Sequence, residues 1–326
     1  MALMAANEYS IGDLRQRFAH TDREEAAPQK VRRERRRALT LPREHGAWGL
    51  LLVPMITGSG IAFHESNHIL PALLLLVAAL ALFWLRTPVE SLLGTSAIRV
   101  QAKDERQVVG TVIAGLVIVA TLALGALLWA WQNPLLWLIG ATAGAAFVGQ
   151  ALLKLMWRQP PRLSSQGEAR HPLSKPLVQR LRMLSEIVGT IGLTASAPAA
   201  YYVITGNFGA TAWMLWAANL IFAGNQIHYV QLRIHNARIE GLRAKLSRGW
   251  AFAVGQFVMT VVLTVACLSG LLPRVASIAF APLLFRGWFY FIQKPAPLKV
   301  RRLGWNELAQ AVTFCVLFIA VFALPK

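Results

Sequence analysis

Residues 42–54 read PREHGAWGLLLVP, so three ionisable residues stand directly before an apolar run. The run continues to residue 63, and further apolar segments of similar length follow it along the rest of the sequence. About 20 predominantly apolar residues are enough to cross a bilayer as a helix. The stretch is therefore interpreted as the entrance to the first of several membrane spans, with its charges at one surface of the membrane.

The composition favours a membrane protein, because 56% of the 326 residues are hydrophobic and only 15% are charged. Glycine, proline and clusters of charge divide the chain into nine apolar segments. They predict an all-α polytopic membrane protein with nine transmembrane helices. The predicted spans are approximately residues 46–63, 70–87, 108–131, 135–154, 184–204, 211–232, 249–270, 275–293 and 306–324.

The first 41 residues are polar. A basic run, KVRRERRRALTLPR, covers residues 30–43 at the end of this segment. They lack the apolar segment of a signal peptide. We interpret residues 1–41 as a basic, partly disordered cytoplasmic tail that lies against anionic lipid headgroups, and residues 42–326 as the transmembrane domain. No aromatic residues are interleaved among these arginines, so no nucleic acid partner is expected.

The placement of lysine and arginine orients the predicted spans. Cytoplasmic loops are enriched in both residues, and with nine spans all but two of the 33 fall on the side of the N-terminus. The two exceptions are Arg274 and Lys326. We therefore predict a multi-pass protein of the cytoplasmic (inner) membrane, with its N-terminus in the cytoplasm and its C-terminus outside.

Polar residues enter the predicted spans in the cytoplasmic half. An ionisable side chain at such a place is costly and marks a candidate functional site. Asn225, His228, Gln231, His235 and Arg238 recur every three or four residues and so share one broad helix face. Such a face is expected to line a cavity or to pack on other polar helices.

Arg286 lies too deep in its predicted span for easy snorkelling. It needs either a bound anion or a carboxylate partner, for which Glu44, Glu186 and Glu307 are candidates. The candidate ligand-binding residues of the resulting cytoplasm-facing polar chamber are Arg43, Glu44, His45, Arg86, Glu90, Glu186, Asn225, His228, Gln231, Arg233 and Arg286.

Two other interpretations stay open for part of this set. Arg43, Arg86 and Lys154 stand near span ends and would also serve as simple interface anchors. His45 and His228 are expected at similar depth, as the two axial ligands of a haem would be.

Missing motifs limit the chemistry. Aspartate occurs only at positions 13, 22 and 104, so the clustered carboxylates that hold magnesium with a diphosphate are lacking. The patterns GxxxxGK[ST], HExxH and GxSxG do not occur either. No metal is expected, no cofactor or catalytic residue is assigned, and the question of whether the protein is an enzyme stays open.

The stretch PREHGAWGLLLVP resembles the YwiC-like family of bacterial integral membrane proteins. The segment NQIHYVQLRIHNAR (225–238) and the segment RRLGWNE (301–307) carry the same resemblance. It extends over residues 41–326 and implies an integral membrane protein, but no biochemical activity.

The nine-helix layout, with basic inner loops after the second, fourth and sixth spans, is similar to the UbiA superfamily of prenyltransferases. That resemblance implies a UbiA-like bundle and a prenyl diphosphate held through magnesium by aspartate motifs. The corresponding loops read RTPVESLLGTS (86–96) and HNARIEGLRAK (235–245) and contain no aspartate.

The sequence therefore predicts a chamber for an anionic amphiphile, such as an isoprenoid, a quinone or a lipid. This hypothesis includes a degenerate or metal-independent prenyltransferase. A non-catalytic scaffold or assembly factor of a membrane complex and a small-molecule transporter are the alternatives.

Overall fold

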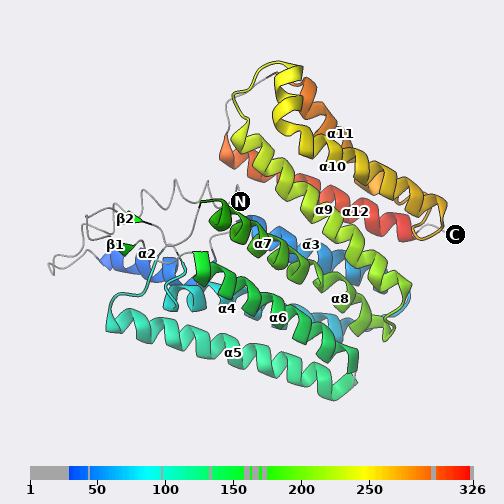
Figure 1. Ribbon diagram of the computed structural model, residues 1–326. Coiled ribbons are helices and arrows are strands. Elements are labelled where there is room, and N and C mark those ends of the chain that lie inside the picture. The colour runs from blue at the N-terminus through cyan, green and yellow to red at the C-terminus, as the bar shows by residue number, and fades with distance from the viewer. Residues whose placement is uncertain are drawn as a thin grey trace. The chain divides into compact units, whose positions relative to one another are not determined.

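The computed structural model describes residues 29–42, 45–96, 98–131, 134–157, 162–163, 169–170, 175–294 and 299–323. These residues are helical apart from turns and one antiparallel pairing of two short strands, β1 (Arg162–Leu163) and β2 (Ala169–Arg170) (Figure 1). The predicted all-α class is confirmed. Contacts between residues divide the chain into two compact units.

The first unit comprises residues 44–72 and 193–326 with a short N-terminal piece. Its helices are α3 (His45–Ala62), the start of α4 (Ile69–Leu92), α8 (Ser196–Thr205), α9 (Ala210–His235), α10 (Leu242–Leu268), α11 (Ser277–Ile292) and α12 (Val300–Ala323). Helix α3 packs on α8, α9 and α12, while α9, α10 and α11 contact one another and α11 also contacts α12.

Small residues allow α3 and α8 to approach closely, as is common between membrane helices. A side chain at Gly58 would collide with the backbone carbonyl of Ala197, and one at Gly60 would meet Ile319 of α12. The buried amide of Asn219 on α9 donates hydrogen bonds to the hydroxyl of Thr57 (3.0 Å) and to the carbonyl of Leu215 (2.9 Å). The contact between α3 and α9 is thus fixed by a satisfied polar pair.

The second unit comprises residues 9–43 and 73–192. Its helices are α2 (Gln29–Thr40), the larger part of α4, α5 (Lys103–Trp131), α6 (Pro134–Trp157) and most of α7 (Lys175–Thr194). Helix α2 packs on α5 through a small core of buried residues, namely Ala38, Leu39, Ile98 and Val109. Helices α6 and α7 come close where Gly189 faces the side chain of Gln150 and Gly192 faces Ala146.

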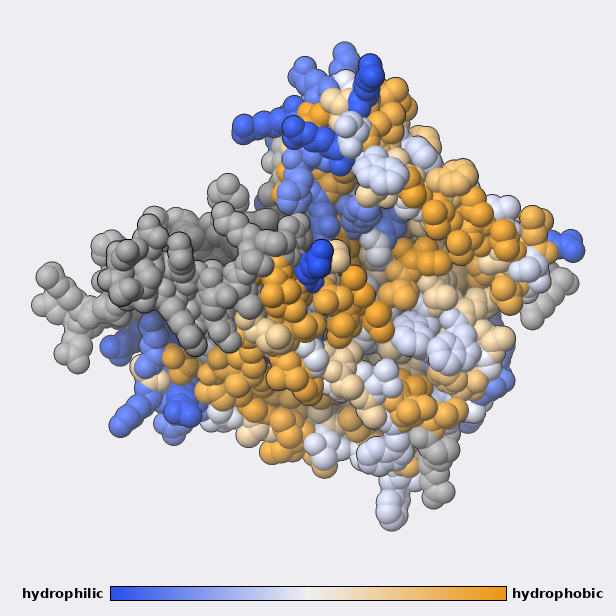
Figure 2. Space-filling view, viewed as in Figure 1, coloured by the Kyte–Doolittle hydropathy of each residue, from blue (hydrophilic) through white to orange (hydrophobic). Residues whose placement is uncertain are grey.

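Six stretches of helix in the described chain are long and apolar enough to cross a membrane. They are Ile69–Leu92, Lys103–Ala130, Leu135–Met156, Met183–Thr205, Leu242–Leu268 and Arg301–Ala323. Two shorter apolar helices, Trp48–Ala62 and Ser277–Ile292, accompany them. Hydrophobic residues cover much of the helical surface (Figure 2), as expected of a protein whose helices face lipid.

Each of the nine predicted spans falls on helix, but the spans differ in character. Helix α11 has 16 residues, which gives a length of about 24 Å, somewhat less than the ~30 Å hydrocarbon core. Helix α9 has 26 residues and is long enough, but polar side chains interrupt its second half. The count of nine spans and the predicted orientation therefore remain predictions.

Candidate functional site

A buried ion pair joins α11 to α12 in the first unit. Arg286 Nη1 donates a hydrogen bond to Glu307 Oε1, so Glu307 is the carboxylate, among the three candidates, with which Arg286 pairs. The guanidinium group also lies over the ring of Tyr229 on α9, 4.0 Å from the ring centroid. Gln226, again on α9, donates from Nε2 to the backbone carbonyl of Glu307 at 3.1 Å. Three helices therefore converge on one charged pair.

Gln256 of α10 packs against α11 beside Arg286. Its side chain is fully buried, with 0% of its surface exposed, and it fills the space opposite Gly287, the residue after Arg286. Any side chain at position 287 would overlap the Gln256 amide. This glycine is thus a local requirement for the approach of α10 and α11.

Several buried polar atoms at this level have no hydrogen-bond partner among the described residues. The set consists of Asn225 Oδ1, both polar atoms of the Gln256 side chain, Arg286 Nε and Nη2, Glu307 Oε2 and Gln310 Oε1. We call Asn225, Gln226, Gln256, Arg286, Glu307 and Gln310 the polar layer. Buried polar groups are normally paired with protein, ordered water or ligand, because leaving one unpaired costs about 1–3 kcal/mol.

Aromatic side chains lie on both sides of the polar layer. Toward one end of the four helices Tyr229, Phe252, Tyr290 and Phe291 form a buried cluster with Leu232. Toward the other end Phe314 stacks on Phe222 and on Phe318 and contacts Phe280 edge-on. The polar layer thus lies between two aromatic clusters, where charges and dipoles act on one another more strongly than in bulk water.

The predicted polar face of α9 is divided between neighbours. Asn225 donates weakly to the sulfur of Met259 on α10 (3.8 Å), and the ring of His228 meets Phe252 edge-on at 5.2 Å. Gln231 is half-buried one turn further along. Arg233 lies over the ring of Tyr290 at 5.9 Å. Asn225 and His228 therefore face α10, whereas Gln226 and Tyr229 face the ion pair of α11 and α12.

The predicted polar face of α9 is also shorter than the spacing of Asn225 to Arg238 suggests. Helix α9 ends at His235, whose Nδ1 lies 2.8 Å from the carbonyl of Gln231, and Arg238 follows in an exposed turn. Sequence reasoning did not include Gln226, Gln256 or Glu307 among the ligand-binding candidates. A usable signal was present, since Gln256 and Gly287 each interrupt an apolar segment.

The second unit holds a separate charged cluster. Glu90 Oε1 accepts hydrogen bonds from Arg86 Nε at 2.9 Å and from Lys154 Nζ at 2.6 Å. The side chain of Lys154 is only 3% exposed. Glu90 and Arg86 of α4 are therefore joined to Lys154 of α6, and the interpretation of Arg86 and Lys154 as interface anchors stays a prediction. Glu186 belongs to the same unit and is half-buried.

Three predicted site residues are described little or not at all. Arg43 and Glu44 lie outside the described residues, and for His45 only its place at the start of α3 is described. The haem interpretation therefore remains untested. Among the described residues no group of three or more histidine, cysteine, aspartate or glutamate side chains could hold a metal ion.

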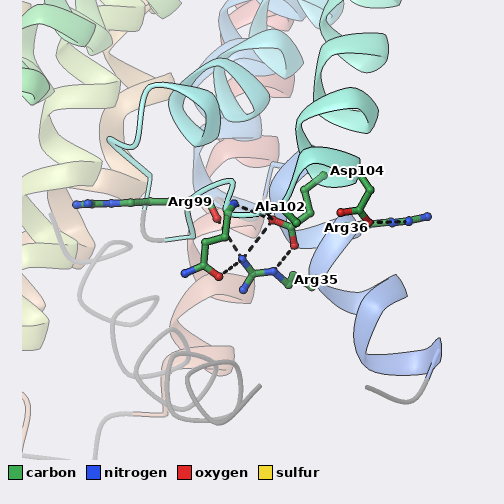
Figure 3. A network of polar contacts seen from close by, with 7 residues as sticks. Arg35, Arg36, Arg99, Ala102 and Asp104 are labelled. Carbon is green, nitrogen blue, oxygen red and sulfur yellow. Dashed lines mark hydrogen bonds and ion pairs between the residues drawn. The ribbon is translucent and has the colours of Figure 1, made fainter. Parts of the chain in front are cut away.

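The described part of the predicted basic tail is helix α2, which is held on the start of α5 (Figure 3). Arg35 donates to both carboxylate oxygens of Glu105, to Gln101 Oε1 (2.7 Å) and to the backbone carbonyl of Arg99 (3.3 Å). Glu105 Oε2 also accepts from the backbone amides of Gln101 and Ala102. Arg36 pairs with Asp104 at 3.2 Å in a more exposed position. Helix α2 thereby presents Arg32, Arg33 and Arg37 to the outside.

The helices and their apolar surfaces define the chain as a helical membrane protein. Residues 41–162 match the family model described as YwiC-like protein, so the predicted resemblance is confirmed for this part of the chain. The comparisons with curated proteins and with solved structures give no match. The resemblance beyond residue 162 and the UbiA-like layout remain predictions.

Proposed function

We propose that this protein crosses the cytoplasmic membrane nine times, with its N-terminus inside, and binds the anionic head of an amphiphilic ligand in the polar layer of α9–α12. The ligand class is an isoprenoid, a quinone or a lipid that carries a carboxylate or a phosphate. The binding needs no metal ion in this proposal, because the free N–H donors of a guanidinium group contact the head directly.

One observation carries the proposal. Arg286 uses Nη1 for Glu307 and the face of its guanidinium for Tyr229, while Nε and Nη2 are buried without an acceptor among the described residues. A guanidinium edge with two such donors matches the two oxygens of a carboxylate or phosphate. The unpartnered side-chain amide of Gln256 adds a donor at Nε2 and an acceptor at Oε1, and Glu307 Oε2 adds a second acceptor, for a hydroxyl or an ester group.

The charge balance of the layer limits the ligand. Glu307 already neutralises Arg286, so a singly charged head with hydrogen-bonding oxygens is a better match than a fully ionised diphosphate. This agrees with a sequence that lacks aspartate motifs for magnesium. We accordingly propose ligand retention as the function of the site and assign no catalytic step to it.

Native mass spectrometry of the full-length protein in mild detergent tests the proposal. Arg286→Lys keeps the pairing charge for Glu307 but removes the two donors at Nε and Nη2, whereas Arg286→Ala would leave Glu307 buried without a partner. We expect the wild type to retain a small amphiphile that is lost in Arg286→Lys. The matched control is Arg274→Lys, because Arg274 is exposed before the start of α11.

Equal retention in wild type and Arg286→Lys would contradict the proposed site. Protein free of ligand in both samples would also contradict it and would favour a scaffold or a transporter. A high-resolution experimental structure that shows only ordered water in the polar layer would explain the unpaired atoms without a ligand.

The predicted contact of the basic tail with anionic lipid headgroups is also a proposal. It is supported by the outward row of arginines on α2 and by the position of α2 beside the polar start of α5. Each such cation near an anionic membrane surface contributes about 1 kcal/mol.

A further inference from the structure

An apolar groove of about 370 Å³ runs between α10 and α11 in the first unit. Leu242 and Leu246 of the first turns of α10 line one wall, and residues between Phe285 and Ile292 of α11 line the other. The described side chains that line it are leucine, isoleucine, phenylalanine and tryptophan. The side chains at the rim are strongly exposed, with 72% of Phe285 and 70% of Ile292 accessible.

The groove is distinct from the polar layer. Phe285, Phe289 and Ile292 recur every three or four residues and share one face of α11, whereas Arg286 and Tyr290 lie on another face. The contacts agree with this division, because Arg286 pairs with Glu307 of α12 and Tyr290 is buried beside Tyr229 of α9. One face of α11 thus lines the groove, and another face contacts α9 and α12.

The shape of the groove is fixed by two local devices. Lys245 Nζ donates to the backbone carbonyls of Tyr290 (3.3 Å) and Gln293, which ties the start of α10 to the end of α11. The backbone departs from helical geometry at Gly249 (φ −104°, ψ 17°), where a side chain would press on Leu232 and Phe291. The kink at Gly249 therefore lies next to Phe291, which also lines the groove.

The groove accommodates part of an extended hydrocarbon chain. Its wall from Phe285 to Ile292 is about 10 Å long. The aromatic wall, in which Phe285 and Phe289 stack at 5.7 Å, supplies a rigid surface for a chain.

Cations stand where the groove reaches the ends of both helices. Arg243 directly follows Leu242, the first residue of α10, and Lys294 lies two residues beyond Ile292, the last residue of α11. Both side chains are exposed. Hydrophilic residues gather over the loop between α9 and α10 and the adjoining helix ends, above a hydrophobic surface (Figure 2). An apolar channel with positive charge at one end is complementary to a lipid with a negatively charged head.

We propose that this groove is a binding site for an anionic phospholipid, with one acyl chain between α10 and α11 and the phosphate at Arg243 and Lys294. The site lies outside the polar layer and does not depend on the ligand proposed for it. It would fix a lipid at the junction where α10, α11 and the following loop meet.

The test is native mass spectrometry of the full-length protein titrated with phosphatidylglycerol or with phosphatidylcholine, each carrying one palmitoyl and one oleoyl chain. We expect tighter binding of phosphatidylglycerol, and a loss of about tenfold in its affinity in the double variant Arg243→Gln, Lys294→Gln. Leu246→Trp fills the groove and is expected to displace the bound lipid of either kind. Val262→Trp is the matched control, because Val262 is exposed on another face of α10.

Arg286→Lys must leave the lipid affinity unchanged, which separates this site from the polar layer. Equal affinity for both lipids, with no effect of the charge variants, would reduce the groove to ordinary lipid contact and overturn the proposal. Unchanged binding in Leu246→Trp would overturn it as well. A dimer that Leu246→Trp dissociates would assign the groove to a second copy of the chain instead.

Discussion

Arg286 carries its charge at a position where neither bulk water nor lipid can solvate it, and Glu307 supplies the compensating charge. A buried ion pair of this kind adds little net stability, because both groups lose their hydration. Removing one partner is far more costly, since the other charge is then left alone in a medium of low dielectric constant. The loss of stability is therefore large when one partner is removed, although the intact pair adds little.

Glu307→Leu is expected to lower the free energy of unfolding by about 3–5 kcal/mol, because Arg286 loses its only ion-pair partner among the described residues. The double variant Arg286→Met, Glu307→Leu removes both charges and is expected to recover most of that loss. Thermal unfolding in detergent measures both effects. Glu240→Gln, at an exposed residue before α10, is the control. A double variant no more stable than Glu307→Leu would contradict this account of the pair.

Among the helices, α2 shows how a segment with strong charge becomes part of a folded unit. Its buried face consists of Val31, Ala38 and Leu39, and Arg35 completes that face by binding Glu105. Trp84 of α4 adds a hydrogen bond from Nε1 to the carbonyl of Thr40 at 2.7 Å. Arg32, Arg33 and Arg37 are exposed, so docking and most of the surface charge are carried by different faces of one helix.

Arg35→Ala is expected to loosen α2 by about 1.5–3 kcal/mol, the usual value of hydrogen bonds to charged groups, while Arg36→Ala is expected to cost less than 1 kcal/mol. The difference follows from exposure, because the Arg35 and Glu105 side chains are 15% and 10% exposed and the Arg36–Asp104 pair is open to solvent. Hydrogen exchange of the α2 backbone measures the opening. Equal protection in both variants would show that the apolar contacts alone hold α2.

For the whole molecule, the decisive property is how often the chain crosses the membrane. Six helices qualify by length and composition, and α3, α9 and α11 complete the nine spans that we propose. A bundle can include short or polar helices as long as neighbouring helices cover their polar groups. Helix α9 meets this condition in part, because its polar residues contact α3, α10, α11 and α12.

The proposed topology is tested with single-cysteine variants. Cys267 and Cys315 are first replaced by alanine, and one cysteine is then introduced at a chosen position. Asn207→Cys, in the turn before α9, is expected to react with a membrane-impermeant maleimide applied from outside. Glu240→Cys, in the turn after α9, is expected to react only after the membrane is opened. Both positions are exposed, so access to the reagent is not limited by folding. Labelling of both from the same side would show that α9 does not cross the membrane.

Sequence by itself determined the helical membrane class and the approximate positions of the helical segments on which the nine predicted spans fall. Apolar segments bounded by glycine, proline and charge are local signals, and a helix satisfies its own backbone hydrogen bonds within each segment. Sequence also named both Arg86 and Glu90 as candidate site residues, and the structure pairs them, because residues four apart are neighbours on a helix. The family resemblance likewise depended on a local stretch and is confirmed over residues 41–162.

Only the tertiary structure decided which side chains meet across helices. Glu307 pairs with Arg286, Gln256 lies opposite Gly287, and Lys154 reaches Glu90, because each contact depends on how helices distant in sequence are packed. Helix α2 docks for the same reason, since its apolar face has a partner only once α5 is in place. Helical periodicity specifies the direction of a side chain around its own axis, but the neighbour in that direction is set by packing of the whole unit.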